Sequence, residues 1–210
     1  MMTHQEDKWS SEFGKEYNLR NDYTVDGQNQ LSMERFGLSR DEINLEFIGN
    51  LSRDIKILEI GCNFGGQLNQ LQSIGFKNLY GIELQWDAVE RAKNKTTGIN
   101  IIQASGFDIP YKDNYFDLVF TSGVLIHINP DNLKNVFKEM VRVSNQYIWG
   151  FEYFNEEFTE LPYRGQGNLM WKGDYQKLFQ SQFPELSEVK RKIYPYLIDS
   201  NRDIMYLLKK

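Results

Sequence analysis

Cysteine and histidine are scarce in this 210-residue sequence, which contains Cys62 as its single cysteine and only two histidines. One cysteine excludes a disulfide bond within the chain and a metal site built from several cysteines. The sequence also lacks an apolar run long enough to span a bilayer, and its polar start lacks the apolar core of a signal peptide. We therefore predict a soluble, cytoplasmic protein with no membrane partner.

Positive charge is not in excess either, because the net charge is −5 and the isoelectric point is near 5.2. The only dense basic cluster is residues 190–192, within a predicted strand. An enzyme that acts on nucleic acid normally presents a basic face to the phosphates, so a DNA or RNA partner is disfavoured. No cluster of aspartate and histidine surrounds the fourth predicted strand, and we expect no metal requirement. A small-molecule acceptor is the partner that remains.

Strand and helix patterns alternate along most of the chain, which predicts a parallel sheet with right-handed crossovers. Two extended stretches near the C-terminus are predicted to pair antiparallel. The expected fold class is therefore α/β, a Rossmann-like doubly wound sheet of seven strands, mostly parallel with a C-terminal antiparallel pair. The predicted strands lie at about 55–60, 78–83, 99–104, 116–121, 146–154, 186–197 and 202–209.

The first part of the chain is predicted to be helical. Residues 1–50 are expected to form a lid or cap over a domain of residues 51–210, within a single globular unit. One helix is expected to begin at Ser39, because Glu42 three residues later completes a capping box. The oligomeric state is not predicted.

The segment 58–66 follows an apolar run and leads into an amphipathic helix. A strand that ends in a glycine-rich turn and opens a helix builds a nucleoside-binding crevice. Gly61 and Gly65 fit this pattern, but Asn63 replaces the glycine that lets a dinucleotide's pyrophosphate approach the backbone. Asparagine tolerates a left-handed backbone, so the turn is retained. With Glu59 before the turn, the pattern resembles the first motif of methyltransferases that use S-adenosylmethionine, whose methionine half carries an ammonium and a carboxylate instead of phosphates.

Glu83 ends the next predicted strand, 22 residues after Gly61. An acidic side chain at about this spacing is placed to accept hydrogen bonds from both ribose hydroxyls. The alternative is a solvated glutamate at a strand end. The glycine turn at the matching distance favours the ribose role.

The loops after the third and fourth predicted strands supply further candidates. Ser105 and Gly106 are expected to flank the adenine, and Phe107 to lie on its face. The alternative is a turn filled by small residues. Ser122 and Gly123 are expected near the reactive methyl group, where a glycine permits close backbone approach.

His127 follows in the same loop and has two interpretations. As a general base it would take the proton of an attacking hydroxyl. As a structural residue it would hold the loop through a hydrogen bond, because polar groups at this depth need partners. The structural interpretation is favoured.

Aromatic residues are concentrated in two places. Trp9 and Tyr17 belong to an aromatic stripe that ends at Arg20 and predicts a single helix; this helix is either a packed element or a lid whose guanidinium binds a carboxylate. The second group follows the fifth strand, at the edge of the sheet where acceptors bind. It either covers the sheet or offers rigid surface to a sugar or another amphipathic ring.

Several motifs are distributed along nearly the whole chain: Trp9-x-x-x-Phe13-Gly14-x-x-Tyr17-x-x-Arg20-Asn21, Glu59-x-Gly61-x-Asn63-x-Gly65, Glu83, the run 124–128 with Pro130-Asp131, and Tyr163-Arg164-Gly165. Together they resemble the pseudaminic acid biosynthesis-associated methylases. The resemblance implies S-adenosylmethionine as cofactor, S-adenosylhomocysteine as product, and a sugar or sugar-nucleotide acceptor of the nonulosonic acid type. The acceptor is implied by the resemblance alone.

The predicted site thus has three parts. The candidate catalytic residue is His127, and no residue is assigned to a metal. The predicted acceptor contacts are Trp9, Tyr163, Arg164 and Trp171. The predicted cofactor contacts are Tyr17, Arg20, Glu59, Gly61, Cys62, Asn63, Gly65, Glu83, Leu84, Ser105, Gly106, Phe107, Ser122 and Gly123.

Alternative functions remain open at this point. A nicotinamide-dependent oxidoreductase shares the strand, turn and helix, but Asn63 opposes it. A non-catalytic module that binds S-adenosylmethionine fits the same motifs, as does a methyltransferase of another small molecule. A protein or RNA methyltransferase is disfavoured by the net negative charge.

Overall fold

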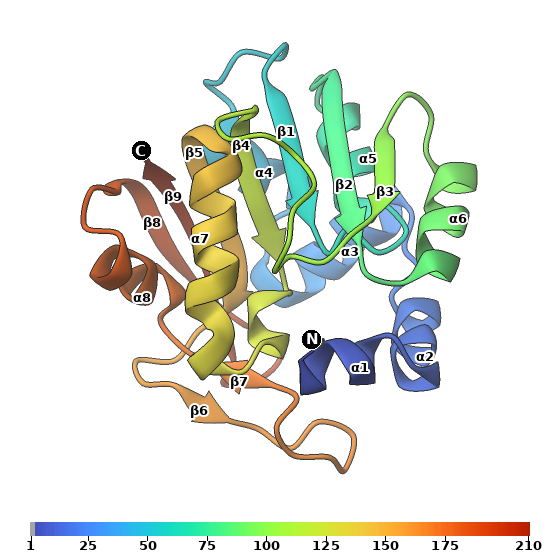
Figure 1. Cartoon of the computed structure of the whole chain (residues 1–210), viewed down its shortest axis with the longest axis vertical. Coiled ribbons are helices and arrows are strands. Elements are labelled where there is room, and N and C mark those ends of the chain that lie inside the picture. Colours follow the sequence, from blue (N-terminus) through green and yellow to red (C-terminus); the bar gives the residue numbers. More distant parts are fainter. Residues whose placement is uncertain (1–2) are drawn as a thin grey trace.

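The computed structural model describes residues 3–210 and contains one seven-stranded sheet in the order β3-β2-β1-β4-β5-β9-β8 (Figure 1). Strands β1 to β5 run parallel, whereas β9 pairs antiparallel with both β5 and β8. The fold-class prediction is confirmed, including the C-terminal antiparallel pair. The strands are β1 (Lys56–Ile60), β2 (Asn78–Glu83), β3 (Asn100–Gln103), β4 (Phe116–Ser122), β5 (Ser144–Tyr153), β8 (Ser187–Pro195) and β9 (Arg202–Lys209).

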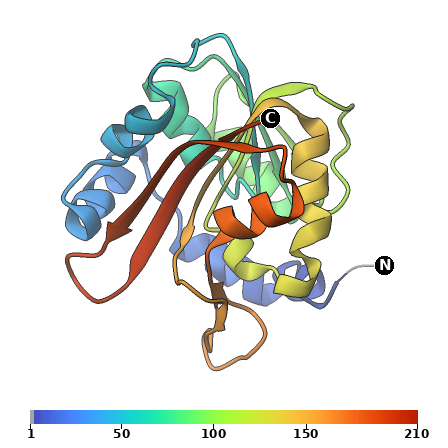
Figure 2. The same ribbon diagram turned by 90° about the vertical axis from the view of Figure 1, so that its left-hand side faces the viewer.

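Helices cover both faces of the sheet, and each face has its own apolar cluster. Helices α7 (Leu133–Val143) and α8 (Tyr175–Gln182) pack on one face. Helices α4 (Arg40–Ile48), α5 (Gly66–Ser73) and α6 (Trp86–Lys95) pack on the other. Figure 2 shows the sheet from its β8 side with helices to the left and right of it. Burial on both faces explains why the central strands are nearly continuous apolar runs.

The N-terminal region is more divided than predicted. The expected single helix is two helices, α1 (His4–Trp9) and α2 (Glu12–Arg20). The break follows from local chemistry, because Ser11 has extended backbone angles and its hydroxyl donates to the Lys8 carbonyl at 2.6 Å. The capping box at Ser39 is confirmed and begins α4.

Helix α3 (Val25–Phe36) was not predicted, because its packing against the domain is partly polar. The fully buried Gln70 of α5 donates to Asn29 Oδ1 at 2.9 Å and to Asp41 Oδ1 at 2.6 Å. Asn29 in turn donates to Asp41 at 2.8 Å. A helix attached through amides and a carboxylate has no strong apolar stripe, which is the signal that sequence patterns rely on.

Two segments lie at the edge where the parallel strands end (Figure 1). One is the pair of helices α1 and α2. The other is a hairpin of β6 (Thr159–Glu160) and β7 (Trp171–Lys172). None of the helices within residues 3–210 has the length and apolar character that a bilayer crossing requires.

The close packing of β5 against β9 yields a stability prediction. Gly150 is paired with the fully buried Tyr206, and a Cβ at Gly150 would overlap the tyrosine ring. Gly150→Ala should therefore lower the free energy of unfolding by about 1–3 kcal/mol, measured by urea titration. The control is Gly167→Ala, in an exposed loop where the new Cβ would meet only Glu160 Oε1, at 3.1 Å. Equal stability of the two variants would show that the Tyr206 ring moves aside without cost.

Candidate active site

A cavity of about 670 Å³ lies at the carboxyl ends of the parallel strands. It is lined by residues from the N-terminal helices, the strand ends and the loop between β6 and β7. Most of the predicted site residues meet in it although they are distant in the sequence. The predicted residues that line it are Trp9, Tyr17, Arg20, Glu59, Gly61, Cys62, Asn63, Glu83, Leu84, Ser105, Gly106, Phe107, Ser122, Gly123, His127, Tyr163 and Arg164.

Two predicted site residues, Gly65 and Trp171, do not line this cavity. Gly65 adopts a positive φ of 78° at the start of α5, and a Cβ there would lie 2.7 Å from Thr96 Cγ2. It is needed for the turn and for close packing. Trp171 is buried in β7, where its carbonyl accepts the Tyr175 hydroxyl at 3.0 Å. Trp171 lies outside the cavity lining, and its contact with an acceptor stays a prediction.

The glycine turn after β1 has the geometry that its residues predict. Gly61 has a φ of 69° and Asn63 a φ of 48°, so asparagine adopts the left-handed conformation there. A side chain at Gly61 would place Cβ 2.8 Å from Val124 Cγ2. The Asn63 side-chain oxygen is buried without a hydrogen-bond partner among the described residues. The turn therefore directs an unsatisfied acceptor toward the cavity.

Cys62 is buried beneath the turn. Its sulfur lies so close to β2 that a Cβ on Gly81 would be 2.6 Å from it. Burial raises the pKa of the Cys62 thiol well above its usual value. A protonated, enclosed thiol is inert, as expected of a residue that fills the turn.

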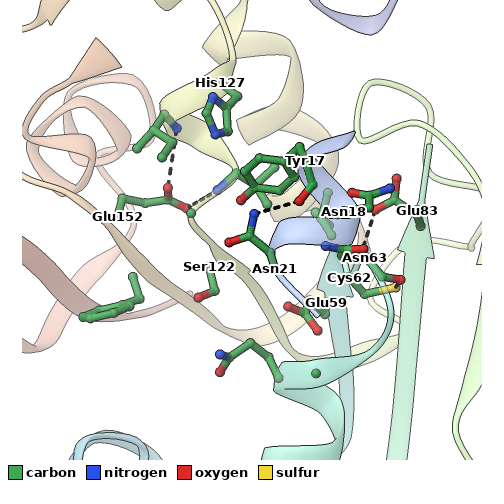
Figure 3. Close-up of a pocket in the computed structure, with 18 of the residues that line it drawn as sticks. Tyr17, Asn18, Asn21, Glu59, Cys62, Asn63, Glu83, Ser122, His127 and Glu152 are labelled. Atoms are coloured by element: carbon green, nitrogen blue, oxygen red, sulfur yellow. Dashed lines mark hydrogen bonds between the residues drawn. The ribbon is translucent and has the colours of Figure 1, made fainter. Parts of the chain in front are cut away.

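Glu83 connects the glycine turn to the next strand. Its carboxylate accepts the backbone N–H of Asn63 at 2.9 Å (Figure 3). It also accepts the backbone N–H of Gln85 at 3.0 Å. Burial raises the pKa of Glu83, and these backbone hydrogen bonds oppose the increase. Each oxygen can accept a further hydrogen bond. The turn thus holds the carboxylate at the cavity wall, while its contact with ribose stays a prediction.

The loop after β3 contacts helix α1. The Ser105 hydroxyl donates to Glu6 Oε1 at 2.6 Å and accepts the Phe107 N–H at 3.0 Å. Glu6 also lines the cavity, although nothing in its local sequence indicated a site. Only the docking of α1 against this loop places a carboxylate beside Ser105.

Arg20 and Tyr17 lie on α2 and face the cavity. One guanidinium nitrogen of Arg20, Nη1, is 3.7 Å from Glu16, and the other, Nη2, is buried without a partner among the described residues. Arg20 therefore has a free donor for an anion. Burial raises the pKa of the Tyr17 hydroxyl, which stays protonated at neutral pH. Figure 3 shows Tyr17 beside His127.

His127 is enclosed by aromatic rings and hydrogen-bonded to the backbone. Its ring centroid is 4.4 Å from that of Trp9 and 5.3 Å from that of Tyr163. Nδ1 is 2.9 Å from the Leu169 carbonyl, which is the contact that the structural interpretation requires. Burial lowers the pKa of His127 to about 4, so the ring is neutral. With Nδ1–H donating to that carbonyl, Nε2 carries the free lone pair. The general-base role stays a prediction.

Tyr163, Arg164 and Gly165 form a tight turn between β6 and β7. The Tyr163 N–H donates to Gln166 O at 2.8 Å, and both central residues have positive φ, 50° at Arg164 and 76° at Gly165. This is the pattern of a type I′ turn. The turn brings Tyr163 and Arg164 to the cavity mouth, opposite α1.

Seven charged residues that line the cavity were not predicted from the sequence. They are Glu6, Asp22, Arg35, Arg40, Lys95, Glu152 and Asp203. Glu152 is the one with a sequence signal, because it is a single acid in the apolar strand β5. It is 1% exposed, and its oxygens accept the N–H groups of Val124 and Ile126 at 3.3 and 3.4 Å. Burial raises the pKa of Glu152 to about 7.

Within residues 3–210, no group of three or more histidine, cysteine, aspartate or glutamate side chains is arranged to hold a metal ion. The expectation of metal independence stays a prediction.

Residues 58–146 match the family model described as a methyltransferase domain. Similar curated proteins include cycloartenol-C-24-methyltransferase 1 of Oryza sativa subsp. japonica, 26% identical over 52% of this chain and 33% of that protein. Another is phosphoethanolamine N-methyltransferase of Plasmodium falciparum, 25% identical over 42% of this chain and 35% of that protein. The chain thus spans about a third of the length of these relatives.

A solved structure extends the likeness to the whole chain. Magnesium protoporphyrin IX methyltransferase from Synechocystis PCC 6803, with bound S-adenosylmethionine, has a TM-score of 0.70 at 12% identity and covers 100% of this chain and 98% of its own. The chain therefore has the fold of S-adenosylmethionine-dependent methyltransferases, and its residues 58–146 are similar to a methyltransferase domain.

The buried Asp203 yields a prediction of pH-dependent stability. Burial raises its pKa to about 7, although the Tyr196 hydroxyl lies 3.1 Å from both carboxylate oxygens and opposes the increase. The folded protein then keeps a proton that the unfolded chain loses near pH 4. This contribution to stability is full below pH 4 and is lost as the pH rises to about 7.

The measurement compares wild type with Asp203→Asn by urea unfolding across this range. The free energy of unfolding of wild type should fall relative to that of the variant by on the order of 3 kcal/mol. Comparing the two proteins cancels the contribution of His127, because both contain it. The lowered pKa of His127 makes the free energy of unfolding rise with pH, opposite to the effect of Asp203. Exposed Asp26→Asn is the matched control for losing one carboxylate. A constant difference between wild type and Asp203→Asn would show that Asp203 is ionised throughout.

Proposed function

We propose that this protein transfers a methyl group from S-adenosylmethionine to a small polar acceptor. The observation that carries the proposal is the group of unsatisfied polar atoms around the glycine turn. Glu59 Oε2, Asn63 Oδ1 and Arg20 Nη2 are all buried without partners among the described residues, and all three residues line the cavity. Buried polar groups rarely stay unpaired in a folded protein, so this arrangement favours a polar ligand with charges of both signs.

The residues at this end of the cavity fit the cofactor group by group. Glu83 would accept hydrogen bonds from the ribose hydroxyls, and Ser105, Gly106 and Phe107 would flank the base. Arg20 would bind the methionine carboxylate, and the Glu59 side of the turn would receive the ammonium. When bound, S-adenosylmethionine supplies a methyl group on an activated sulfonium. The protein's main task is then to hold the acceptor in line, and such positioning can contribute ~7–11 kcal/mol.

Aromatic side chains enclose the reacting region. Trp9, Tyr17 and Tyr163 surround His127 from two separate parts of the chain. They would exclude water from the acceptor, which strengthens polar interactions at the site. The neutral His127 would accept a proton from an acceptor hydroxyl at Nε2, while the Leu169 carbonyl holds Nδ1.

The nature of the acceptor is the finer part of the proposal. We propose a sugar or sugar nucleotide of the nonulosonic acid type, as the resemblance to the pseudaminic acid-associated methylases implies. Charged side chains of Arg35, Glu152 and Asp203 line the cavity beyond the cofactor residues and support a polar acceptor. An apolar ring system such as a sterol would leave these groups desolvated and unpaired.

The test of the function combines binding with turnover. Calorimetric titration should show that S-adenosylhomocysteine binds to the cavity, and methyl-labelled S-adenosylmethionine should label a compound in a panel of sugars and sugar nucleotides. Tight cofactor binding without any labelled product would support a binding module instead. Preferential binding of NADH would contradict the proposal.

Glu83→Ala tests the ribose contact. Removing the carboxylate should weaken S-adenosylhomocysteine binding by about 1.5–3 kcal/mol, because the ribose hydroxyls would lose a charged hydrogen-bond acceptor. Calorimetry on Glu83→Ala and on the control Glu90→Ala, a surface variant of α6 outside the cavity, measures this. Unchanged affinity in Glu83→Ala would refute the ribose role. Glu83→Gln distinguishes loss of charge from collapse of the turn.

His127→Asn separates the two interpretations of the histidine. An asparagine amide can still donate to the Leu169 carbonyl but has no counterpart to Nε2. If His127 is the base, both His127→Asn and His127→Ala should lower kcat by roughly 10²–10⁴-fold with unchanged cofactor affinity. A near-normal kcat in the asparagine variant alone would leave only the structural role.

A further inference from the structure

Arg40 is a buried cation without an ionic partner. It is the first residue of α4 and is 6% exposed, and one of its nitrogens donates to Ser122 Oγ at 3.0 Å. The guanidinium lies 4.2 Å from the centre of the Phe151 ring, and Nε is buried without a partner. Within residues 3–210 no carboxylate forms a salt bridge with it. Ser122 and Phe151 satisfy only part of the group, and an unpaired buried charge is costly.

The carboxyl groups that act electrostatically on Arg40 are those of Asp203, Glu59 and Glu152, and they do not fully neutralise its charge. Burial lowers the pKa of Arg40 to about 10, so it stays charged at neutral pH. Burial also raises the pKa of Glu152 and of Asp203 to about 7, and that of Glu59 well above its usual value. Glu152 and Asp203 are thus partly protonated near neutral pH. These two carboxyls are better suited to share hydrogen bonds with hydroxyl or amino groups than to neutralise Arg40.

A second arginine lines the same end of the cavity. Arg35 lies in the last turn of α3, and its guanidinium is 5.5 Å from the ring centre of Tyr196, the residue that contacts Asp203. It is half-buried, and it too forms no salt bridge within the described part of the chain. Two guanidinium groups from α3 and α4 therefore line one end of the cavity without a paired carboxylate.

Asp203, at this end of the cavity, lies far from Glu83 in the sheet, whereas Arg40 reaches the predicted cofactor contact Ser122. Glu83 ends β2, whereas Asp203 lies in β9, which is separated from β2 by β1, β4 and β5. Strands about 4.8 Å apart place the two residues roughly 19 Å from each other. Figure 3 shows Glu83 and Glu152 on opposite sides of the close-up, with Ser122 between them. Arg20, with its own free nitrogen, is available for the cofactor carboxylate.

We propose that Arg40 and Arg35 form an anion-binding subsite for the acceptor, so that the acceptor carries a carboxylate or a phosphate and presents hydroxyl or amino groups to Glu152 and Asp203. This inference rests on the proposed methyl transfer and narrows its substrate class. A guanidinium fork matches the planar geometry of a carboxylate or two oxygens of a phosphate. A neutral acceptor would leave both arginines unpaired.

The test uses the full chain with S-adenosylhomocysteine present and three probes that share a sugar ring. Glucuronate supplies a carboxylate, glucose 6-phosphate supplies a phosphate, and glucose supplies neither. Calorimetry should detect binding of at least one anionic probe and no binding of glucose at the same millimolar concentrations. Comparison of the two anions decides which group the subsite prefers.

Variants then assign the binding to the two arginines. Arg35→Gln should lower the affinity for the preferred anion roughly tenfold, because one charge-assisted contact is lost. Arg40→Lys should also lower this affinity, because lysine lacks the two parallel donors of a guanidinium. Arg35→Gln should not change S-adenosylhomocysteine affinity by more than about twofold. Arg91→Gln removes one positive charge from an exposed position outside the cavity and should change neither affinity. Thermal unfolding of each variant confirms that it is folded.

Three outcomes would overturn the inference: binding of glucose as tight as that of the anions, no anion binding that depends on Arg35, or an Arg40→Lys variant that loses S-adenosylhomocysteine instead of the anion. The last would assign the Arg40 guanidinium to the cofactor carboxylate. The same titrations without cofactor separate this inference from the proposed function. A chain that binds the anion but not S-adenosylhomocysteine would refute methyl transfer and leave the anion subsite standing.

Discussion

The carboxylate of Glu83 is the contact on which the site depends. It accepts backbone N–H groups from the turn after β1 and from the start of α6, so one side chain fixes two loops at the carboxyl edge of the sheet. Asn63 can stand in that turn only because it adopts a left-handed backbone. Once this corner is fixed, the close approach of Val124 to Gly61 sets the position of the loop after β4. The cavity floor is built outward from these contacts.

The cavity differs from an ordinary apolar pocket in the number of charged groups that the fold buries in it. Arg40, Glu59, Glu152 and Asp203 are each less than a tenth exposed. Removing such groups from water costs free energy, and few of them recover it through ion pairs within the chain. An apolar lining would make a more stable domain. Ligands whose charges complement these groups would offset the desolvation cost when they bind. The proposed cofactor and the proposed anionic acceptor are both explained by this one physical cause.

How far the sequence predicts this protein depends on the kind of packing involved. The predicted bounds of β2, 78–83, agree with the structure because apolar periodicity and end signals coincide there. Helix α3 was missed because Gln70 and Asp41 attach it through side-chain hydrogen bonds, which leave no apolar stripe. The division of the first helix was missed because the four-residue aromatic spacing of Trp9, Phe13 and Tyr17 continues across the break at Ser11. Trp171 was assigned to the acceptor because its residue type suits binding, yet a large aromatic residue suits a buried hairpin equally well.

The sequence by itself determined the α/β class, the strand–turn–helix with its glycines, and the acid at the end of the second strand, because these depend on local backbone preferences and fixed spacings. Only the tertiary structure decided which charged side chains line the cavity together with these elements. Arg35 and Arg40 come from helices before the sheet, Glu152 from its fifth strand and Asp203 from its last, and among them only Glu152, a single acid in an apolar strand, has a local signal. The strand order β4-β5-β9 and the docking of α3 and α4 bring these residues together. Long-range packing sets that arrangement, and no periodicity in a single chain encodes it.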